Sequence, residues 1–464
     1  MLLIDKKNLI SDIESFLTSK VLITLGINKK NELGRLMYEI FLSKGWVFPD
    51  GLNLLGIENI IENGRGELFH NIKKKLLNIR YPSLKPGDNA RLIPLKMTDK
   101  IEEEAAWNFN LSPRTIFVEK SIRALQWTND FIKNFPEAEI EYIENITDFR
   151  LQIPAKAGMT GKNILYNHRR ENIFLTGSKT AFIKMCPCSK NCVRCDYWVL
   201  NIGFGCPIDC AYCYLQTYSN SPGLVLPANI EDYYKYVEAF DKKVKEKVRM
   251  GTGEFTDSLA LDKYTGYSSK LIPLFRKTKN LVLELKTKIG RIDNVLREKP
   301  HDNVVISWSM NAGFIAETYE KGGEPVKGRI SAALEAARRG YKIGFHFDPI
   351  IFHKGWAKSY ESLVHEMFSF EAIRNNTVWI SLGTLRYTPS LKQAAEQRFD
   401  ENLMFYEGEF FEGFDGKLRY PNELRVEMYN KMVKWIRKFN SSCCIYLCME
   451  HEDIWKKLPL QLQQ

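Results

Sequence analysis

Long apolar runs are missing from this chain of 464 residues. No apolar segment of the signal-peptide type follows a basic stretch near the start, and no uninterrupted apolar run approaches the length that spans a bilayer. Both absences argue against a membrane partner and favour a cytoplasmic protein. In that reducing compartment thiols stay free of disulfides, so clustered cysteines are expected to bind something.

Internal repeats, low-complexity segments and a strong excess of one charge are also absent. Hydrophobic residues make up 44% and charged residues 26% of the chain, which is the composition of a folded globular protein. The formal net charge of +10 permits attraction to a phosphate backbone without showing it, and a lysine-rich surface explains it equally well. The length predicts two or three domains.

Cysteine is missing between Cys213 and Cys443, which makes its concentration elsewhere informative. Seven of the ten cysteines lie between Cys186 and Cys213, and the others are Cys443, Cys444 and Cys448. Chance burial of small apolar residues would scatter them, so the first group predicts a metal or cluster site. We expect the last three to be packed small residues of the C-terminal segment.

Apolar, strand-like runs alternate with amphipathic helical stretches from Tyr197 onward. This alternation predicts βαβ units, a parallel sheet and right-handed crossovers. Reactive residues should then gather at the carboxyl ends of the strands. The runs lie at 199–205, 281–288, 303–311, 341–350 and 378–386, with a weaker run ending at 250–257.

The most specific motif is "GCPIDCAYCYLQ" at 205–216, with cysteines spaced C-x3-C-x2-C and tyrosines on both sides of the last one. Structural zinc usually takes two cysteine pairs a dozen or more residues apart. Three thiolates on one tight loop instead suit a cubane iron–sulfur cluster with one iron left open. That iron can bind a second molecule.

This spacing resembles the signature of radical S-adenosylmethionine (SAM) enzymes, and the longer string is similar to spore photoproduct lyase and its relatives. The likeness continues through "GEFTDSLALD", "LELKTK", "WSMN", "GYKIGFHFDPIIFHKGW" and "YLCME", from about Ser112 to the C-terminus. It implies an α/β fold built on a partial (β/α)6 TIM-type barrel of the radical SAM type, with an N-terminal α/β region and a C-terminal helical extension. We expect four regions: a mostly helical extension at 1–110, a small α/β domain at 111–196 ending in a cysteine-rich loop, the barrel at 197–405 and a helical segment at 406–464.

The resemblance implies a [4Fe–4S] cluster on Cys206, Cys210 and Cys213, with SAM on its open iron. One electron, from a donor such as flavodoxin or ferredoxin, cleaves SAM to methionine and a 5′-deoxyadenosyl radical, which abstracts hydrogen from the substrate. Tyr212 is expected near the adenine, and Tyr214 either relays an electron or hydrogen or walls the site.

Other contacts follow from the same resemblance, each with an ordinary strand-end polar residue as its alternative. Six residues are assigned to SAM: Gly253 and Glu254 at its ammonium, Asp257 and Ser258 near its ribose, and Lys288 and Ser309 at strand ends. His346 and Asp348 alternate with phenylalanines, so both face one side of their strand and are candidate substrate contacts, as is Arg386. The alternative for His346 is a hydrogen-bonded core histidine.

A second group of cysteines, "CPCSKNCVRC", precedes the barrel. Its four thiols could hold an auxiliary iron–sulfur cluster or zinc, or could stay unliganded; they are Cys186, Cys188, Cys192 and Cys195. Spore photoproduct lyase lacks this quartet. It also carries a hydrogen-donor cysteine near the second strand, where this chain reads "GTGEFTDS".

Three functions therefore stay open. The first is a lyase-like radical SAM enzyme acting on nucleic acid, as in DNA photoproduct repair. The second is a radical SAM enzyme that modifies RNA, a peptide or a small molecule. The third is a non-enzymatic iron–sulfur or zinc protein that binds nucleic acid.

Overall fold

The computed structural model describes residues 6–19, 25–57, 60, 67–82, 111–148, 166–177, 183–189, 191–219, 223–400, 402–413 and 415–460. The chain forms two compact units. One combines residues 1–103 with 403–421, and the other contains residues 104–402 and 422–464. No helix among the described residues is long and apolar enough to cross a membrane.

The N-terminal unit is built mainly from helices. Its elements are α1 (Lys6–Ser19), α2 (Ile27–Lys44), α3 (Asp50–Leu55), α5 (Leu68–Arg80), η4 (Leu403–Phe405), β15 (Phe411–Glu412) and β16 (Leu418–Arg419). In α2, the buried side chains of Leu33, Leu36 and Ile40 recur at helical spacing and enter the core of this unit. Arg35 is fully buried and lies 3.5 Å from Glu409. The segment 403–421 thus supplies the counter-charge for α2.

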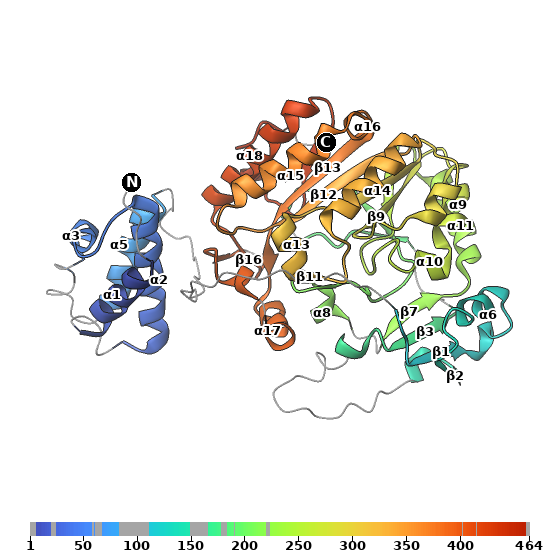
Figure 1. Cartoon of the computed structure of the whole chain (residues 1–464), viewed down its shortest axis with the longest axis horizontal. Coiled ribbons are helices and arrows are strands. Elements are labelled where there is room, and N and C mark those ends of the chain that lie inside the picture. The colour runs from blue at the N-terminus through green and yellow to red at the C-terminus, as the bar shows by residue number, and fades with distance from the viewer. Residues whose placement is uncertain are drawn as a thin grey trace. The chain divides into compact units, whose positions relative to one another are not determined.

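A small parallel sheet opens the larger unit. Its strands follow the order β2 (Glu139–Ile143), β1 (Thr115–Glu119), β3 (Asn172–Thr176) and β7 (Leu224–Pro227). Ile116, Val118 and Ile173 are fully buried and pack with Phe131 of α6 (Gln126–Ile132). Figure 1 shows this sheet beside α6. The strand predicted within 112–120 is β1.

The main sheet holds eight strands and is curled into a partial barrel. Seven run parallel, and β4 joins the edge antiparallel. In order they are β4 (Ile183–Met185), β5 (Trp198–Leu200), β8 (Val248–Gly251), β9 (Leu281–Thr287), β10 (Val304–Ser309), β12 (Lys342–Ile350), β13 (Thr377–Thr384) and β17 (Cys444–Leu447). The α/β barrel predicted from the sequence is confirmed. Its six predicted strands are β5, β8, β9, β10, β12 and β13.

The seventh parallel strand, β17, comes from the C-terminal segment. That segment was expected to be helical, and it does contribute α18 (Asn422–Phe439) and α19 (Glu452–Trp455). Between them, Ile445, Tyr446 and Leu447 are buried in the sheet beside β13. The short apolar run containing a β-branched and an aromatic residue suits a strand. The sheet therefore ends in residues from the end of the chain.

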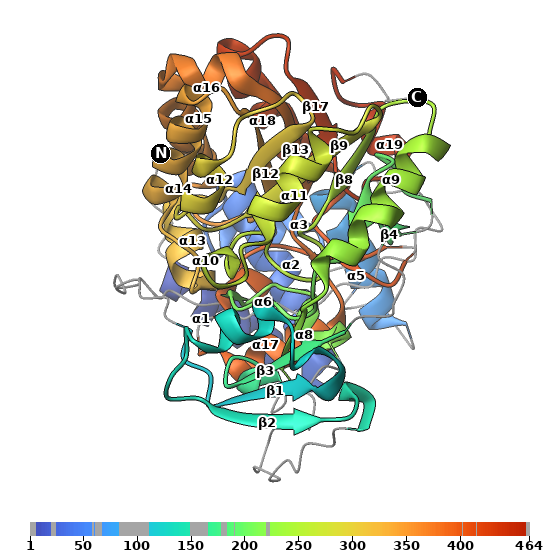
Figure 2. The ribbon, with the colours of Figure 1, turned by 90° about the vertical axis from the view of Figure 1, so that its right-hand side faces the viewer.

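Helices lie against the sheet where the chain crosses between parallel strands, and Figure 2 shows several of them beside β8, β9, β12, β13 and β17. In α14 (Val326–Arg338), Ala332, Ala333 and Ala336 are buried. These small side chains let the helix approach β10 and β12 closely. The remaining elements are α8 (Leu215–Tyr218), α9 (Tyr233–Lys243), α10 (Asp262–Thr265), α11 (Tyr267–Phe275), α12 (Asp293–Arg297), α13 (Gly313–Tyr319), α15 (Trp356–Ser369), α16 (Glu371–Asn376) and α17 (Pro389–Arg398), the short strands β6 (Asp209–Cys210), β11 (Glu320–Lys321) and β14 (Arg386–Tyr387), and the turns η1 (Lys120–Ile122), η2 (Ile146–Asp148) and η3 (Ile230–Asp232).

Candidate active site

The motif cysteines lie on one loop that follows β5 at the carboxyl end of the main sheet. Gly205 opens the loop with φ +83°, a conformation that favours glycine. β6 then pairs with β11, so that Cys210 lies opposite Glu320. The next amide, that of Ala211, donates to the carbonyl of Tyr319 at 2.8 Å. These contacts attach the middle of the loop to the segment after α13.

Two buried arginines hold the same loop from the other side. Arg169 donates to the carbonyl of Cys206 at 2.9 Å and to the carboxylate of Asp209 at 2.8 Å. Arg398 of α17 donates to both oxygens of Asp209, each at 2.8 Å, and also to Gln216. Gln216 in turn donates to the carbonyls of Cys210 and Ala211. Asp209 therefore connects the loop to two elements that lie far apart in the sequence.

The three thiols suit an iron–sulfur cluster by chemistry and by surrounding charge. Burial raises the pKa of Cys206 to about 12 and raises the pKa of Cys210 and Cys213 as well. Arg169 and Lys288 act electrostatically on these sulfurs, so they can offset the negative charge of bound thiolates. In the described residues the thiols are not gathered into a preformed metal site.

A buried polar cluster lies directly behind the loop. The hydroxyl of Tyr212 donates to Glu320, which also pairs with Arg329 at 2.6 Å and Lys288 at 3.7 Å. Burial alone would raise the pKa of Glu320, but the two cations outweigh it and lower that pKa. Arg329 also donates to the carbonyl of Ser309 at 2.9 Å. These contacts join the predicted residues Tyr212, Lys288 and Ser309 through Glu320 and Arg329 near the ends of β9 and β10.

The family model for spore photoproduct lyase matches residues 111–446, which contain the small sheet, the cysteine loop and the barrel through most of β17. The chain belongs to the spore photoproduct lyase family. It is thereby a member of the radical SAM enzymes.

Individual relatives agree with this membership. The chain is 26% identical to spore photoproduct lyase of Clostridium acetobutylicum over 73% of its own length and 99% of the relative. It is 27% identical to that of Geobacillus sp., where the match covers 45% of this chain and 62% of the relative. Two solved structures match 73% of this chain over 99% of their own chains. One is a spore photoproduct lyase variant, with a TM-score of 0.63 and 22% identity. The other is a spore photoproduct lyase complexed with dinucleoside spore photoproduct, with a TM-score of 0.62 and 21% identity. These structural likenesses show a shared fold.

Among the residues that the family resemblance assigns to SAM, Asp257 and Ser258 have defined partners in the protein. Asp257 accepts from the amides of Leu259, Ala260 and Lys288 and from the hydroxyl of Thr287, at 2.7 to 2.9 Å. Ser258 accepts from the amide of Lys286 at 3.0 Å. Both side chains therefore fasten the segment after β8 to the end of β9. Their contact with SAM stays a prediction.

Gly253 and Glu254 lie on that same segment. A Cβ at Gly253 would come within 3.0 Å of the Lys286 side chain, so glycine permits this close approach. Burial would lower the pKa of Lys286, but Glu254, Glu284 and Asp348 outweigh burial and raise it. Lys286 thus carries its charge among several carboxylates on the inner side of the sheet.

His346 lies inside the partial barrel and is engaged with the protein itself. Its Nε2 is 2.7 Å from Glu284, which also accepts from Ser307 at 2.6 Å and from the indole of Trp379 at 2.8 Å. Burial lowers the pKa of His346, while Glu284 opposes that shift only in part. Its place in this network matches the alternative expectation of a hydrogen-bonded core histidine, and a substrate contact stays a prediction.

Asp348 and Arg386 form a bidentate ion pair, in which the two terminal guanidinium nitrogens lie 2.8 and 3.2 Å from the two carboxylate oxygens. Burial would raise the pKa of Asp348, but Arg386 outweighs it and lowers that pKa to about 2. The Arg386 carbonyl accepts from the hydroxyl of Tyr214 at 3.1 Å, and its guanidinium lies 3.5 Å from the sulfur of Cys448. The pair thus connects the cysteine loop with the end of β17.

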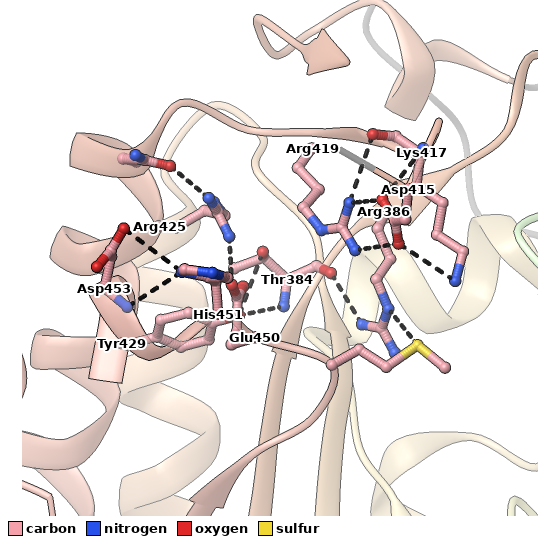
Figure 3. Close-up of polar contacts among 12 residues, drawn as sticks. Thr384, Arg386, Asp415, Lys417, Arg419, Arg425, Tyr429, Glu450, His451 and Asp453 are labelled. Carbon is pink, nitrogen blue, oxygen red and sulfur yellow. Dashed lines mark hydrogen bonds and ion pairs between the residues drawn. The ribbon is translucent and has the colours of Figure 1, made fainter. Parts of the chain in front are cut away.

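The chain after β17 is held by a second buried network, shown in Figure 3. Glu450 accepts from Arg425 and, at 2.7 Å, from Tyr429, both on α18. The amide of Thr384, at the end of β13, donates to the Tyr429 hydroxyl at 2.9 Å. This network fixes the backbone two residues beyond Cys448.

The upstream cysteine quartet packs against the same C-terminal segment. The sulfurs of Cys186 and Cys188 are 4.0 Å apart, and Cys195 lies 3.6 Å from Arg249. Cys192 forms an antiparallel bridge with His451. The loop that carries all four thiols is therefore placed beside the end of β17.

Several residues that shape the site carry no motif in the sequence. Arg169, Arg398, Glu320 and Glu284 become recognisable only when the chain is folded, because their partners are distant in sequence. Cys448 lies in the family-like string "YLCME", but we expected it to be a packed small residue. The structure instead places its thiol against Arg386 at the carboxyl end of β17.

Proposed function

We propose that this protein is a spore photoproduct lyase that splits the methyl-bridged thymine dimer of DNA. The observation that carries the proposal is the three-cysteine loop at the carboxyl end of a parallel partial barrel, in a chain that the family model matches from 111 to 446. A relative was solved with bound AdoMet and dinucleoside spore photoproduct, which names the cofactor and the substrate class we infer.

Cys206, Cys210 and Cys213 would hold a [4Fe–4S] cluster. With SAM bound, that cluster supplies the 5′-deoxyadenosyl radical that begins the reaction. The chain's own residues would position this loop. Arg169 and Arg398 donate hydrogen bonds to it, and Tyr212 of the loop donates a hydrogen bond to Glu320. Cys210 is buried and Cys206 and Cys213 are half-buried, so the fold would limit the access of water to the reacting groups.

SAM would lie across the ends of β8, β9 and β10. We assign its contacts to Gly253, Glu254, Asp257, Ser258, Lys288 and Ser309. Contacts that bring three of these residues together support the assignment. Asp257 accepts a hydrogen bond from the amide of Lys288. Arg329 donates to the carbonyl of Ser309 and pairs with Glu320, which also pairs with Lys288. Since Lys288 is already paired, it would contribute a shared rather than an isolated positive charge to the SAM carboxylate.

The substrate would approach His346, Asp348 and Arg386 from the same strand ends. Arg386 is neutralised by Asp348, so we infer that the pair orients the dimer by hydrogen bonding. A fully paired guanidinium is a weak isolated phosphate site. A donor of the flavodoxin or ferredoxin class would deliver the electron.

We further propose that the quartet Cys186, Cys188, Cys192 and Cys195 holds a second iron–sulfur cluster or zinc. The close sulfurs of Cys186 and Cys188 support this assignment. Metal analysis of a Cys186→Ala, Cys188→Ala double variant tests it. A metal content equal to that of the unaltered protein would rule it out.

The function is tested by anaerobic reconstitution with iron and sulfide, followed by SAM, dithionite and synthetic methyl-bridged dithymidine. We expect 5′-deoxyadenosine and repaired dithymidine from the unaltered protein. Cys213→Ala should form neither, whereas the matched control Cys443→Ala should form both. Cleavage of SAM without conversion of the dimer would reject DNA repair, and absence of cleavage would reject the radical enzyme.

A further inference from the structure

Hydrogen abstraction would leave a carbon radical on the substrate, and breakage of the methyl bridge would pass this radical to the product. The product radical must receive one hydrogen atom before release. A thiol is a suitable donor, yet the segment after β8 contains no cysteine. The fold brings another thiol to the strand ends. Cys448 directly follows β17, and its amide donates to the carbonyl of Leu382 of β13 at 2.8 Å.

The thiol of Cys448 belongs to a group of polar side chains with defined contacts. Its sulfur lies 3.5 Å from the guanidinium of Arg386, and it is hydrogen-bonded to the carboxylate of Asp348. The next residue, Met449, has φ +55°, and its sulfur lies 3.3 Å from Nε of Arg386. Two consecutive residues therefore contact the same guanidinium, which fixes where the thiol lies.

Tyr214 connects this group to the cysteine loop. Tyr214 follows Cys213 directly, and its hydroxyl donates to the carbonyl of Arg386 at 3.1 Å. Arg386 thus contacts Tyr214 through its backbone and Cys448 through its side chain. The carboxyl ends of the first and last parallel strands are thereby joined at one position.

The other two C-terminal cysteines differ from Cys448 in position. Cys443 precedes β17, and its sulfur lies 3.9 Å from the carbonyl of Asn440 at the end of α18. Cys444 is the first residue of β17 and pairs in register with Trp379, near the beginning of β13. Both therefore lie at the amino end of β17, and Cys448 lies at its carboxyl end.

We propose that Cys448 returns the hydrogen atom to the product radical, an inference that rests on the proposed lyase function. The S–H bond breaks and a C–H bond forms, so the unpaired electron passes from carbon to sulfur. One electron from the flavodoxin- or ferredoxin-class donor and one proton from solvent then restore the thiol.

The experiment uses the reconstituted full-length protein, methyl-bridged dithymidine and SAM in deuterated buffer, with products analysed by mass spectrometry. Because a thiol exchanges its hydrogen with solvent, unaltered protein should place one deuterium in each repaired dithymidine. Cys448→Ala and Cys448→Ser should form 5′-deoxyadenosine within about twofold of the unaltered protein but lose at least about tenfold in deuterated product. Cys444→Ala, the matched control, should behave as the unaltered protein does.

The possible outcomes separate the two proposals. If the unaltered protein cleaves SAM but leaves the dimer intact, the lyase function fails and the role of Cys448 fails with it. If the Cys448 variants repair the dimer with normal deuterium content, only the thiol assignment is overturned. Loss of iron or zinc from both Cys448 variants would also overturn it, because Cys448 would then be a metal ligand. Circular dichroism that matches the unaltered protein shows that the variants are folded.

Discussion

Tyr212, between two cluster-loop cysteines, donates its hydroxyl hydrogen to Glu320, which lies 108 positions further along the chain. Glu320 is 3% exposed and is held by Arg329 at 2.6 Å. The cysteine loop is therefore fastened to a buried ion pair rather than to solvent-exposed groups. Changes in this pair should affect the stability of the fold and the placement of the loop together.

Replacing Glu320 by Gln should destabilise the protein strongly. The change leaves Arg329 buried without its counter-ion, and breaking a buried pair in this way costs about 3–5 kcal/mol. Tyr212→Phe removes one hydrogen bond and should cost about 1–2 kcal/mol. Urea unfolding followed by circular dichroism measures both values. Glu335→Gln, in an exposed pair with Arg339, is the control and should stay within about 0.5 kcal/mol.

Asp209→Asn should weaken retention of the cluster. Arg169 and Arg398 would then face a neutral amide in place of a shared carboxylate, so the loop that carries the cysteines would lose its main attachment. We expect a lower iron content after reconstitution and faster loss of iron to a chelator. Asp130→Asn, which alters an exposed pair with Lys133, should keep the iron content of the unaltered protein. Equal chelation rates for the two variants would show that the attachment is unimportant.

Much of this site was predictable from short stretches of sequence. The thiol spacing predicts the cluster site at Cys206, Cys210 and Cys213, which stays a prediction, and apolar runs locate six of the seven parallel strands, because both patterns are local. The contact of Arg398 with Asp209 spans 189 positions and has no local pattern. The same holds for Cys448, whose surroundings depend on β17 joining β13 in the sheet.

Gly383→Ala should displace the Asp348–Arg386 pair by steric overlap with the added methyl group. A Cβ at position 383 would lie 2.4 Å from a carboxylate oxygen of Asp348 and 3.0 Å from Arg386. Relief of this overlap requires the pair to shift, and overpacking of this kind typically costs about 1–3 kcal/mol. Urea unfolding of Gly383→Ala measures that cost. Gly313→Ala is a suitable control, because a Cβ there meets no atom within 4 Å.

The Asp348–Arg386 pair should also give the stability of the protein a defined acid dependence. The pKa of Asp348 falls from 3.8 to about 2 on folding, so its contribution is complete above about pH 4 and is lost as the pH falls toward 2. The shift corresponds to about 2 kcal/mol. We expect the difference in unfolding free energy between the unaltered protein and Asp348→Asn to shrink by about 1.5 kcal/mol between pH 4.5 and 2.5, because the rest of the contribution is lost only below the folded-state pKa. Urea titrations at several pH values measure it, and a difference that stays constant with pH would show that the carboxylate gains no such stabilisation from Arg386.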